Sequence, residues 1–211
     1  MALTQTQISQ LYVTVFGRSS EGAGNLFWQQ TETSVESAAT TMLATQASRD
    51  YFGSSLDSDQ AFIEHIYANT LGKTIADDPE GIAFWVTALA SGNSRGFIIS
   101  ELITAAQNPV NAGSAQDRFN NRVEVSNYVA DTIEGAGLDA TDAAAMQVFI
   151  DFNEMVTSNR ESVLSAKAAV NATPQQQNVN ASDLEIYDAT GGEYSFILNF
   201  SAGQQYAANI E

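Results

Sequence analysis

The chain has 211 residues, of which 44% are hydrophobic and 9% aromatic, so it can bury a core, and wholesale disorder is excluded. Eight Lys and Arg residues stand against 25 Asp and Glu residues, giving a net charge of −17 that repels phosphate backbones and anionic headgroups. We therefore expect no nucleic acid partner, and the absence of cysteine excludes disulfides and thiol catalysis.

Membrane insertion is not expected either. Residues 1–7 contain neither the positive nor the apolar segment of a Sec signal. No stretch approaches the roughly 20 apolar residues that span a bilayer. We expect no transmembrane segment, and an exported form of this chain would carry its export signal elsewhere.

The first predicted helix begins at Thr4, which has Gln7 at the capping-box spacing. Its apolar residues follow the helical period and form one stripe: Ile8, Leu11, Tyr12, Val15 and Phe16. Gly17 follows this stripe and is predicted to end the helix with a positive φ.

The same pattern returns about 55 residues later. Three pairs are 55 residues apart: Tyr12 with Tyr67, Gly17 with Gly72, and Arg18 with Lys73. Three more pairs are 57 apart: Gly24 with Gly81, Phe27 with Phe84, and Trp28 with Trp85. A further helix follows each set, beginning at Ser34 and at Ser94. The sequence predicts two copies of a three-helix repeat, the first copy at about residues 4–53 and the second copy at 58–107.

The turn of the second copy, "ADDPEG", carries its own signals. Asp78 precedes Pro79 and is predicted to cap the next helix, with Glu80 in the first turn. Capping is favoured, and the alternative is that Asp77, Asp78 and Glu80 contribute to a calcium site.

The two tryptophans are expected to be core residues, although sugars also stack on tryptophan. Because neither copy can bury its own stripe well, the copies are expected to stack with approximate two-fold symmetry. Trp28 and Trp85 should then occupy equivalent, largely buried positions.

The expected fold class is mainly α. Residues 1–171 are predicted to form one α-helical domain: the two copies, then long helices over 113–171, interrupted by "EGAGLDATD" and restarted by Thr141 or Asp142. Residues 172–182 have linker composition. Residues 183–211 change to a period of two, predicting a β-hairpin with its turn at Gly191-Gly192. An exposed apolar strand face favours continuation into a further β-rich region.

Catalytic motifs are weak in this sequence. The single histidine, His65, has no cysteine, second histidine or serine elbow with which to build a triad or a zinc site. No phosphate loop or dinucleotide fingerprint is present. The chain is predicted not to be an enzyme.

The repeated pattern resembles a small helical repeat of unknown function, found in bacterial surface-layer proteins and in large type I secreted adhesins. Its residues are apolar-Tyr, four residues, apolar-Gly-Arg/Lys, a turn, and then Phe-Trp. The stretches "DRFNNRVEVSNYVADTIEGAG" (117–137) and "YDATGGEYSFILNF" (187–200) are similar to segments that follow such repeats. The closest resemblance is to the N-terminal region of Gram-negative S-layer proteins of the Campylobacter and Caulobacter kind. The calcium-binding nonapeptide repeats that accompany such proteins are absent from these 211 residues.

This resemblance implies an extracellular module that anchors an S-layer to lipopolysaccharide, exported by type I secretion. Because the chain is acidic, we expect it to bind neutral O-chain sugars, or to use calcium as a bridge to the lipopolysaccharide core. A sugar site should combine amide and hydroxyl groups with an aromatic face, and the candidates are Asn120, Asn121, Arg122, Asn127 and Tyr128. On one helix, however, the first four cannot all share a face. The alternative function is self-association in a lattice or adhesin, through the unpaired edge of the hairpin.

Overall fold

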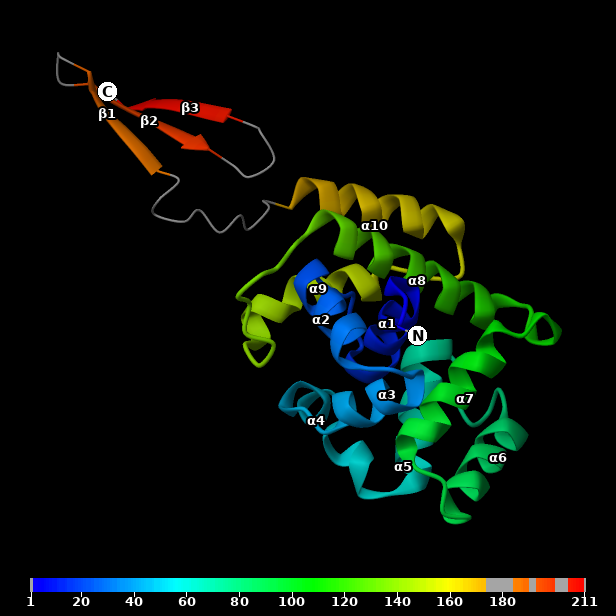
Figure 1. Cartoon of the computed structure of the whole chain (residues 1–211). Coiled ribbons are helices and arrows are strands. Elements are labelled where there is room, and N and C mark those ends of the chain that lie inside the picture. The colour runs from blue at the N-terminus through cyan, green and yellow to red at the C-terminus, as the bar shows by residue number, and fades with distance from the viewer. Residues whose placement is uncertain (1, 174–183, 190–192, 200–204, 211) are drawn as a thin grey trace. The chain divides into compact units, whose positions relative to one another are not determined.

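The computed structural model describes residues 2–173, 184–189, 193–199 and 205–210. The chain divides into two compact units, Met1–Pro174 and Gln175–Glu211. All regular structure described in the first unit is helical, so the predicted mainly α class is confirmed there (Figure 1).

The helices of the first unit are named in chain order, with η marking short π or 3-10 turns. From the N-terminus to residue 57 they are α1 (Gln5–Leu11), η1 (Tyr12–Phe16), α2 (Gly22–Thr31), α3 (Val35–Leu43), α4 (Gln46–Phe52) and η2 (Gly53–Asp57). The second copy contains α5 (Asp59–Ile66), η3 (Tyr67–Leu71), α6 (Pro79–Ala90) and α7 (Arg95–Gln107). The remainder is η4 (Pro109–Asn111), α8 (Ser114–Thr132), α9 (Ala143–Glu154) and α10 (Arg160–Ala172).

The stops predicted for the two Tyr-bearing helices are confirmed, and so is the capping box predicted at the start of the first. Thr4 and Gln7 form a reciprocal capping box at the start of α1. Ser58 caps α5 by accepting a hydrogen bond from the amide of Ala61 at 3.1 Å. Each helix then widens into a π turn and stops at glycine, with φ of 62° at Gly17 and 67° at Gly72. The two copies therefore share their local geometry at both ends of this helix.

The third helices of the copies, α3 and α7, are capped by Ser34 and Ser94, as their spacing predicted. The two helices pack directly on each other. Gly96 permits this contact, because a Cβ there would lie 2.0 Å from Thr40 Oγ1 and 2.9 Å from the carbonyl oxygen of Glu36. The copies are thus joined through equivalent helices.

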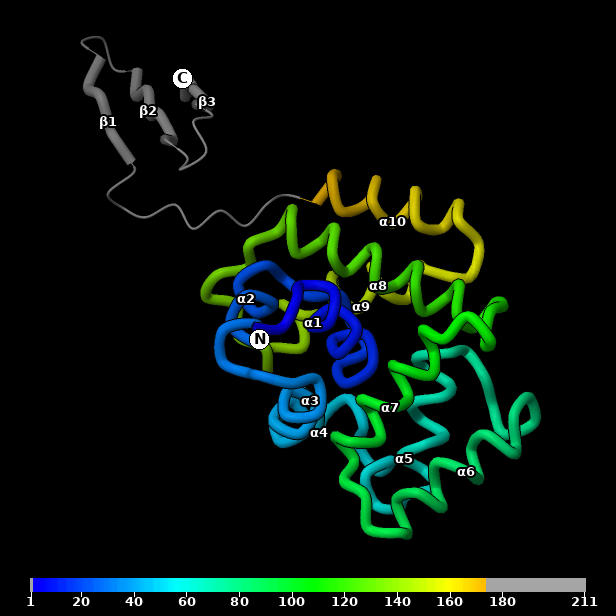
Figure 2. Tube along the Cα trace, turned by 45° about the vertical axis from the view of Figure 1, so that its right-hand side comes forward, coloured from blue at the N-terminus to red at the C-terminus, as the bar shows by residue number. Residues whose placement is uncertain are grey.

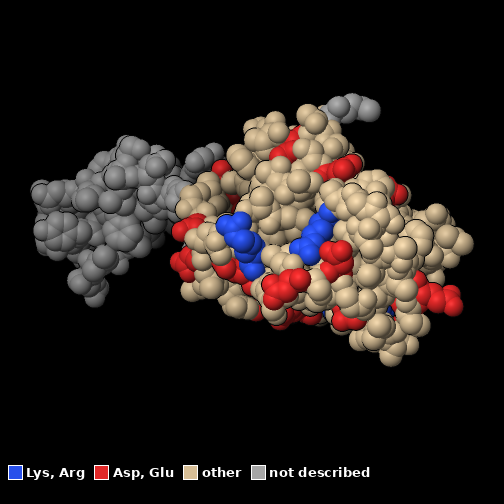
Figure 3. All heavy atoms as spheres, turned by 90° about the horizontal axis from the view of Figure 1, so that it is seen from below, with Lys and Arg blue, Asp and Glu red and all other residues tan. Residues whose placement is uncertain are grey.

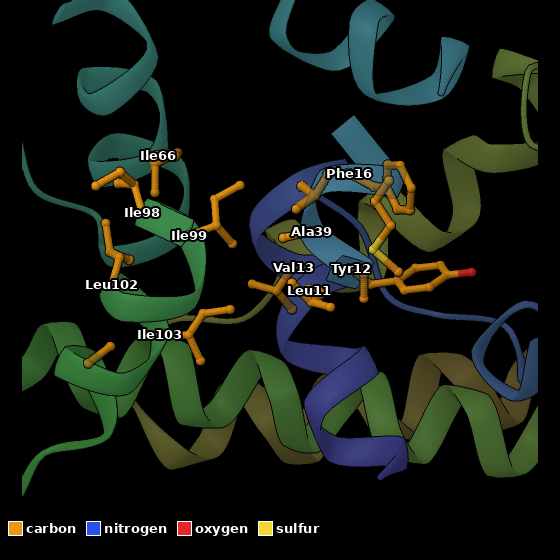
Figure 4. Packing of buried hydrophobic residues seen from close by; sticks show 14 of the residues in the cluster. Leu11, Tyr12, Val13, Phe16, Ala39, Ile66, Ile98, Ile99, Leu102 and Ile103 are labelled. Carbon is orange, nitrogen blue, oxygen red and sulfur yellow. The ribbon is translucent and has the colours of Figure 1, made fainter. Parts of the chain in front are cut away.

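One hydrophobic core spans both copies and the start of α8. Figure 4 shows side chains of α1 and η1, such as Val13, beside Ile99 and Ile103 of α7. A second core lies between the later part of α8 and the helices α9 and α10. The helix α8 contributes Phe119 to the first core and Val129 to the second, so it connects the two.

Beyond the copies, α10 lies alongside α8 in both views (Figures 1 and 2). Asp142 caps α9 through the amides of Ala144 and Ala145, as one of the two predicted caps. The helix α8 ends at Thr132, just before the predicted interruption "EGAGLDATD", and α9 begins after it at Ala143. Among the described residues, no helix is long and apolar enough to cross a membrane.

The tryptophans occupy equivalent positions at the edge of the core, as predicted, and each is partly rather than fully buried. Trp28 and Trp85 are each half-buried and pack against the edge of the first core. Their neighbours Phe27 and Phe84 are 55% and 64% exposed and meet the indole rings edge to face. Successive helical residues point about 100° apart, so only one residue of each Phe-Trp pair can face the core.

The second unit contains the strands β1 (Leu184–Ala189), β2 (Glu193–Asn199) and β3 (Gln205–Ile210). They form an antiparallel sheet in the order β1-β2-β3, with Leu184 opposite Leu198 and Tyr194 opposite Ile210. The predicted hairpin turn at Gly191-Gly192 and most of the predicted linker at 172–182 lie outside the described residues.

Candidate functional site

Each copy places a tyrosine, a basic residue, an acidic residue and a tryptophan around the turn between its first two helices. In the first copy these are Tyr12, Arg18, Glu21 and Trp28; in the second they are Tyr67, Lys73, Asp78 and Trp85. The tyrosine lies where the α-helix passes into the π turn, and the basic residue follows the left-handed glycine. The acidic residue is the N-cap of the next helix, which carries the tryptophan.

A glycine on the tryptophan-bearing helix brings the tyrosine and the acid together in both copies. A Cβ on Gly24 would lie 2.1 Å from Glu21 Oε1 and 2.4 Å from Tyr12 Oη. A Cβ on Gly81 would lie 2.6 Å from Asp78 Oδ2 and 2.7 Å from Tyr67 Oη. Only glycine leaves room for these side chains. The tyrosine and the acid therefore approach the same glycine position in both copies.

In the first copy the arrangement is sealed inside the protein. Tyr12 donates to Glu21 Oε1 at 3.2 Å, and Arg18 Nη1 lies 2.5 Å from Glu21 Oε2. Tyr12, Arg18 and Glu21 are each less than a tenth exposed. The pKa of Tyr12 is well above its usual range, first because burial disfavours the phenolate and second because Glu21 is nearby. Arg18 and Glu21 therefore form a buried ion pair whose carboxylate also accepts the hydrogen bond of Tyr12.

The residues that cover Tyr12, Arg18 and Glu21 belong to segments that follow α8. The first amides of α2 donate to this segment, Gly22 to the carbonyl of Ile133 at 2.9 Å and Ala23 to that of Glu134 at 2.7 Å. From α9, the ring of Phe149 lies 5.8 Å from the guanidinium of Arg18. Because α2 receives its cap from this backbone, the side chain of Glu21 is free to turn inward.

In the second copy Tyr67 is also buried, with 4% of its surface exposed, but Lys73, Asp78 and Trp85 are partly exposed. Trp85 Nε1 donates to Tyr67 Oη at 3.0 Å, and Asp78 Oδ1 accepts from the amide of Gly81 at 2.9 Å. Lys73 Nζ lies 3.5 Å from Asp78 Oδ2, and their side chains are 39% and 31% exposed. Burial, followed by the charge of Asp78, raises the pKa of Tyr67 to about 12, so the phenol is protonated at neutral pH.

These residues line a pocket of about 440 Å³, within the usual size range of small-molecule sites. The helix α7 and the segment around η4 complete the wall with small apolar and amide side chains. The lining residues outside the four are Leu71, Gly81, Leu102, Ala105, Ala106, Asn111, Ala112, Ala115 and Gln116. An indole wall, a tyrosine at the base, an ion pair and two amides at one pocket suit a ligand with both apolar faces and hydroxyl groups. We call this the second-copy pocket.

The sugar-binding residues predicted from sequence do not gather at this pocket. Among the five candidates, Asn121 and Arg122 are buried. Asn121 Nδ2 donates to the carbonyl of Thr157 at 2.9 Å, and Arg122 donates to the carbonyls of Asn69 and Val156. Burial and the neighbouring Arg118 lower the pKa of Arg122 to about 10. These two side chains join elements of the fold.

The other three candidates also make contacts within the fold. Asn120 is exposed and accepts from Gln107 Nε2 at 2.8 Å. Asn127 donates to Thr6 Oγ1 at 3.1 Å. Tyr128 donates to Asn171 Oδ1 at 2.7 Å. Their partners lie on α7, α1 and α10, so the five candidates do not share one binding face.

The acidic turn adopts the predicted cap. Asp77 accepts two hydrogen bonds from Thr74, which lower its pKa, and Asp78 caps α6. Glu80 is exposed in the first turn. In the part of the chain that the structure describes, no three His, Asp or Glu side chains are placed to hold a metal ion. Calcium binding by Asp77, Asp78 and Glu80 stays a prediction.

Most of this pocket was not predicted from the sequence. Arg18 and Lys73 were recognised as equivalent positions of the two copies, but Glu21 and Asp78 were not, although they are 57 residues apart like Gly24 and Gly81. Continuing that register would have found the acid. The residues between 102 and 116 carried no comparable signal, because only folding brings them to the turn.

Comparison with known proteins adds a family of unestablished function. Residues 38–112, from α3 through the second copy to η4, are similar to a family described as a domain of unknown function (DUF4214). The matched segment includes Tyr67, Lys73, Asp78 and Trp85. A search of curated proteins found no match, and neither did a search of solved structures.

Proposed function

We propose that this chain is a non-catalytic anchoring module of a bacterial S-layer or related type I secreted surface protein, and that it binds lipopolysaccharide through the O-polysaccharide. The sequence resemblance supplies the cellular setting, which is extracellular at the cell surface. The structure adds a candidate binding site, the second-copy pocket, in place of the residues around Asn120.

The observation that carries the proposal is the contrast between the two copies. A chain that needed these four residues only for stability could seal both sets, as it seals Tyr12 with Glu21. In the second copy the indole of Trp85, the hydroxyl of Tyr67 and the Lys73–Asp78 pair instead border open volume. A pyranose ring offers an apolar face to an indole and hydroxyl groups to such polar neighbours.

The negative charge of the protein limits which part of the lipopolysaccharide it can bind. Acidic groups are spread over the face in Figure 3, with basic groups in only a few places. The pocket itself contains one cation and one anion, so it adds no net charge. This favours neutral O-chain sugars over the phosphorylated core, and calcium bridging is the route by which the core would be tolerated.

The proposal also treats the helical domain as an internal duplication. Its support is the shared geometry of the copies: left-handed glycines after π turns, serine caps on α3 and α7, and the twofold-repeated group of Tyr, base, acid and Trp. After duplication, one copy would be free to keep the structural role while the other acquired a ligand.

The direct test is binding of the purified chain to lipopolysaccharide from its own host, compared with lipopolysaccharide of a rough strain lacking the O-chain. We expect binding only to the O-chain form. Equal binding to both would overturn the O-chain proposal.

Two tryptophan variants then locate the site. Trp85→Ala removes the aromatic wall of the pocket and should abolish most binding. Trp28→Ala is the matched control, since Trp28 is also partly buried at the equivalent position of the first copy but does not line the pocket. Equal loss of binding in both folded variants would remove the pocket from the proposal.

A second candidate function is protein–protein assembly, supported by the sheet of the second unit. The order β1-β2-β3 leaves β1 and β3 as edge strands within that sheet, and an edge can be extended by a strand of another chain. Deleting residues 182–211 separates the two functions. Loss of self-association with polysaccharide binding intact would assign assembly to the second unit and anchoring to the helices.

A further inference from the structure

The two copies differ at one chemically important position. The acid at the N-cap of the tryptophan-bearing helix is Glu21 in the first copy and Asp78 in the second. Both acids approach the tyrosine of their copy at a glycine. The aspartate is one methylene shorter, and it uses Oδ1 to cap its own helix at Gly81.

This difference changes the hydrogen bonds of the tyrosine hydroxyl. Tyr12 donates its proton to Glu21 at 3.2 Å, so the donor of its hydroxyl is already used. Tyr67 accepts from Trp85, but in the described residues no acceptor takes its proton. The hydroxyl therefore keeps one unused donor at the base of the second-copy pocket.

The cap of each helix explains why the two acids behave differently. In the first copy the carbonyls of Ile133 and Glu134 take the first amides of α2, so Glu21 is not needed as a cap. In the second copy Pro79 has no amide proton, and Asp78 satisfies Gly81 itself. No other backbone is needed at that end, and the space stays open.

We infer that Asp78 keeps the second-copy pocket open, and that the hydroxyl of Tyr67 donates a hydrogen bond to an oxygen atom of the bound sugar. This deepens the proposed function and rests on it. The ligand must place a hydroxyl, ring or carbonyl oxygen over Tyr67 while one ring face lies against Trp85. A donor whose oxygen already accepts a hydrogen bond is polarised by it, which strengthens the contact.

Two substitutions test the inference, using O-polysaccharide released from the lipopolysaccharide of the host and binding measured by calorimetry. Tyr67→Phe removes only the hydroxyl and should weaken binding about 3- to 10-fold, the value of one net hydrogen bond. Asp78→Glu should place a carboxylate on the hydroxyl, as in the first copy, and weaken binding at least as much. Asp57→Glu, an exposed position outside the pocket, is the control for the same chemical change.

The double variant shows whether Asp78 acts through Tyr67. If it does, adding Tyr67→Phe to Asp78→Glu should change the affinity by less than about 2-fold, because the donor is already occupied. Additive losses would contradict the inference, as would Asp78→Glu binding as tightly as the wild type.

A crystal structure of the Asp78→Glu variant shows, without any ligand, whether the longer carboxylate reaches the hydroxyl of Tyr67. The introduced carboxylate should lie at hydrogen-bond distance from Tyr67 Oη, as Glu21 lies 3.2 Å from Tyr12. A carboxylate turned out to solvent would overturn this part of the inference. If the wild-type chain binds no O-polysaccharide, the proposed function and the sugar contact fail together, whatever this structure shows.

Discussion

Removing the basic residue of each copy should have very different effects on stability. Arg18→Met and Lys73→Met both replace a long cationic side chain by an unbranched apolar one, so the packing of the stem is largely kept. Arg18 and Glu21 have side chains only 4% and 9% exposed, so Arg18→Met leaves a carboxylate buried without its cation. Such a loss costs about 3–5 kcal/mol.

The second copy offers the matched case. Lys73 and Asp78 are 3.5 Å apart with side chains 39% and 31% exposed, so water and salt already screen the pair. Asp78 would also keep its cap on Gly81. We expect Lys73→Met to cost about 0–1 kcal/mol.

The assay is urea unfolding followed by tryptophan fluorescence, with the free energy of unfolding obtained by linear extrapolation. Equal slopes in the two variants would show that the comparison is valid. A loss of less than about 1 kcal/mol for Arg18→Met, or an equal loss of unfolding free energy in both variants, would show that the Arg18–Glu21 pair is not buried and essential.

Three further changes test the fold. Gly17→Ala should cost more than Gly72→Ala, although both force a left-handed alanine at about 1–2 kcal/mol. At Gly17 the new Cβ would lie 2.2 Å from Cε2 of the Tyr51 ring, whereas at Gly72 it would lie 2.2 Å from Nη1 of Arg118, the end of a flexible side chain that can move aside. Thermal melts rank the two variants. Burial lowers the pKa of His65, so the unfolded state binds a proton on this residue more readily than the folded state does. Stability should therefore fall as the pH drops below about 6.5. His65→Gln should remove this pH dependence from urea titrations between pH 5 and 8, and an unchanged dependence would contradict the prediction. Thr4→Ala should cost about 1 kcal/mol through loss of the capping box, and no change in melting would show that the cap is not needed.

Local signals predicted the helix ends well because their causes are local. A capping box, a proline at the first helical position and a glycine after an apolar stripe each act over three or four residues. The sequence therefore located Thr4, Asp78, Gly17 and Gly72 in their correct roles.

The sites could not be predicted in the same way. The candidates from Asn120 to Tyr128 are close together in sequence, but a helix places them on different faces, and their hydrogen-bond partners lie in several separate segments of the fold. The pocket depends on residues from 67 to 116, which the fold gathers. Exposure of Phe27 and Phe84 was missed for a related reason, since an aromatic pair in sequence does not say which ring faces inward.

Sugar binding in the second-copy pocket is tested most directly by a crystal structure of the chain soaked with an O-polysaccharide fragment from its own host. We expect a sugar in this pocket, with a ring face on Trp85 and an oxygen at hydrogen-bond distance from Tyr67. A fragment bound instead on α8 at Asn120 and Tyr128, or an empty pocket beside an occupied site elsewhere, would contradict it.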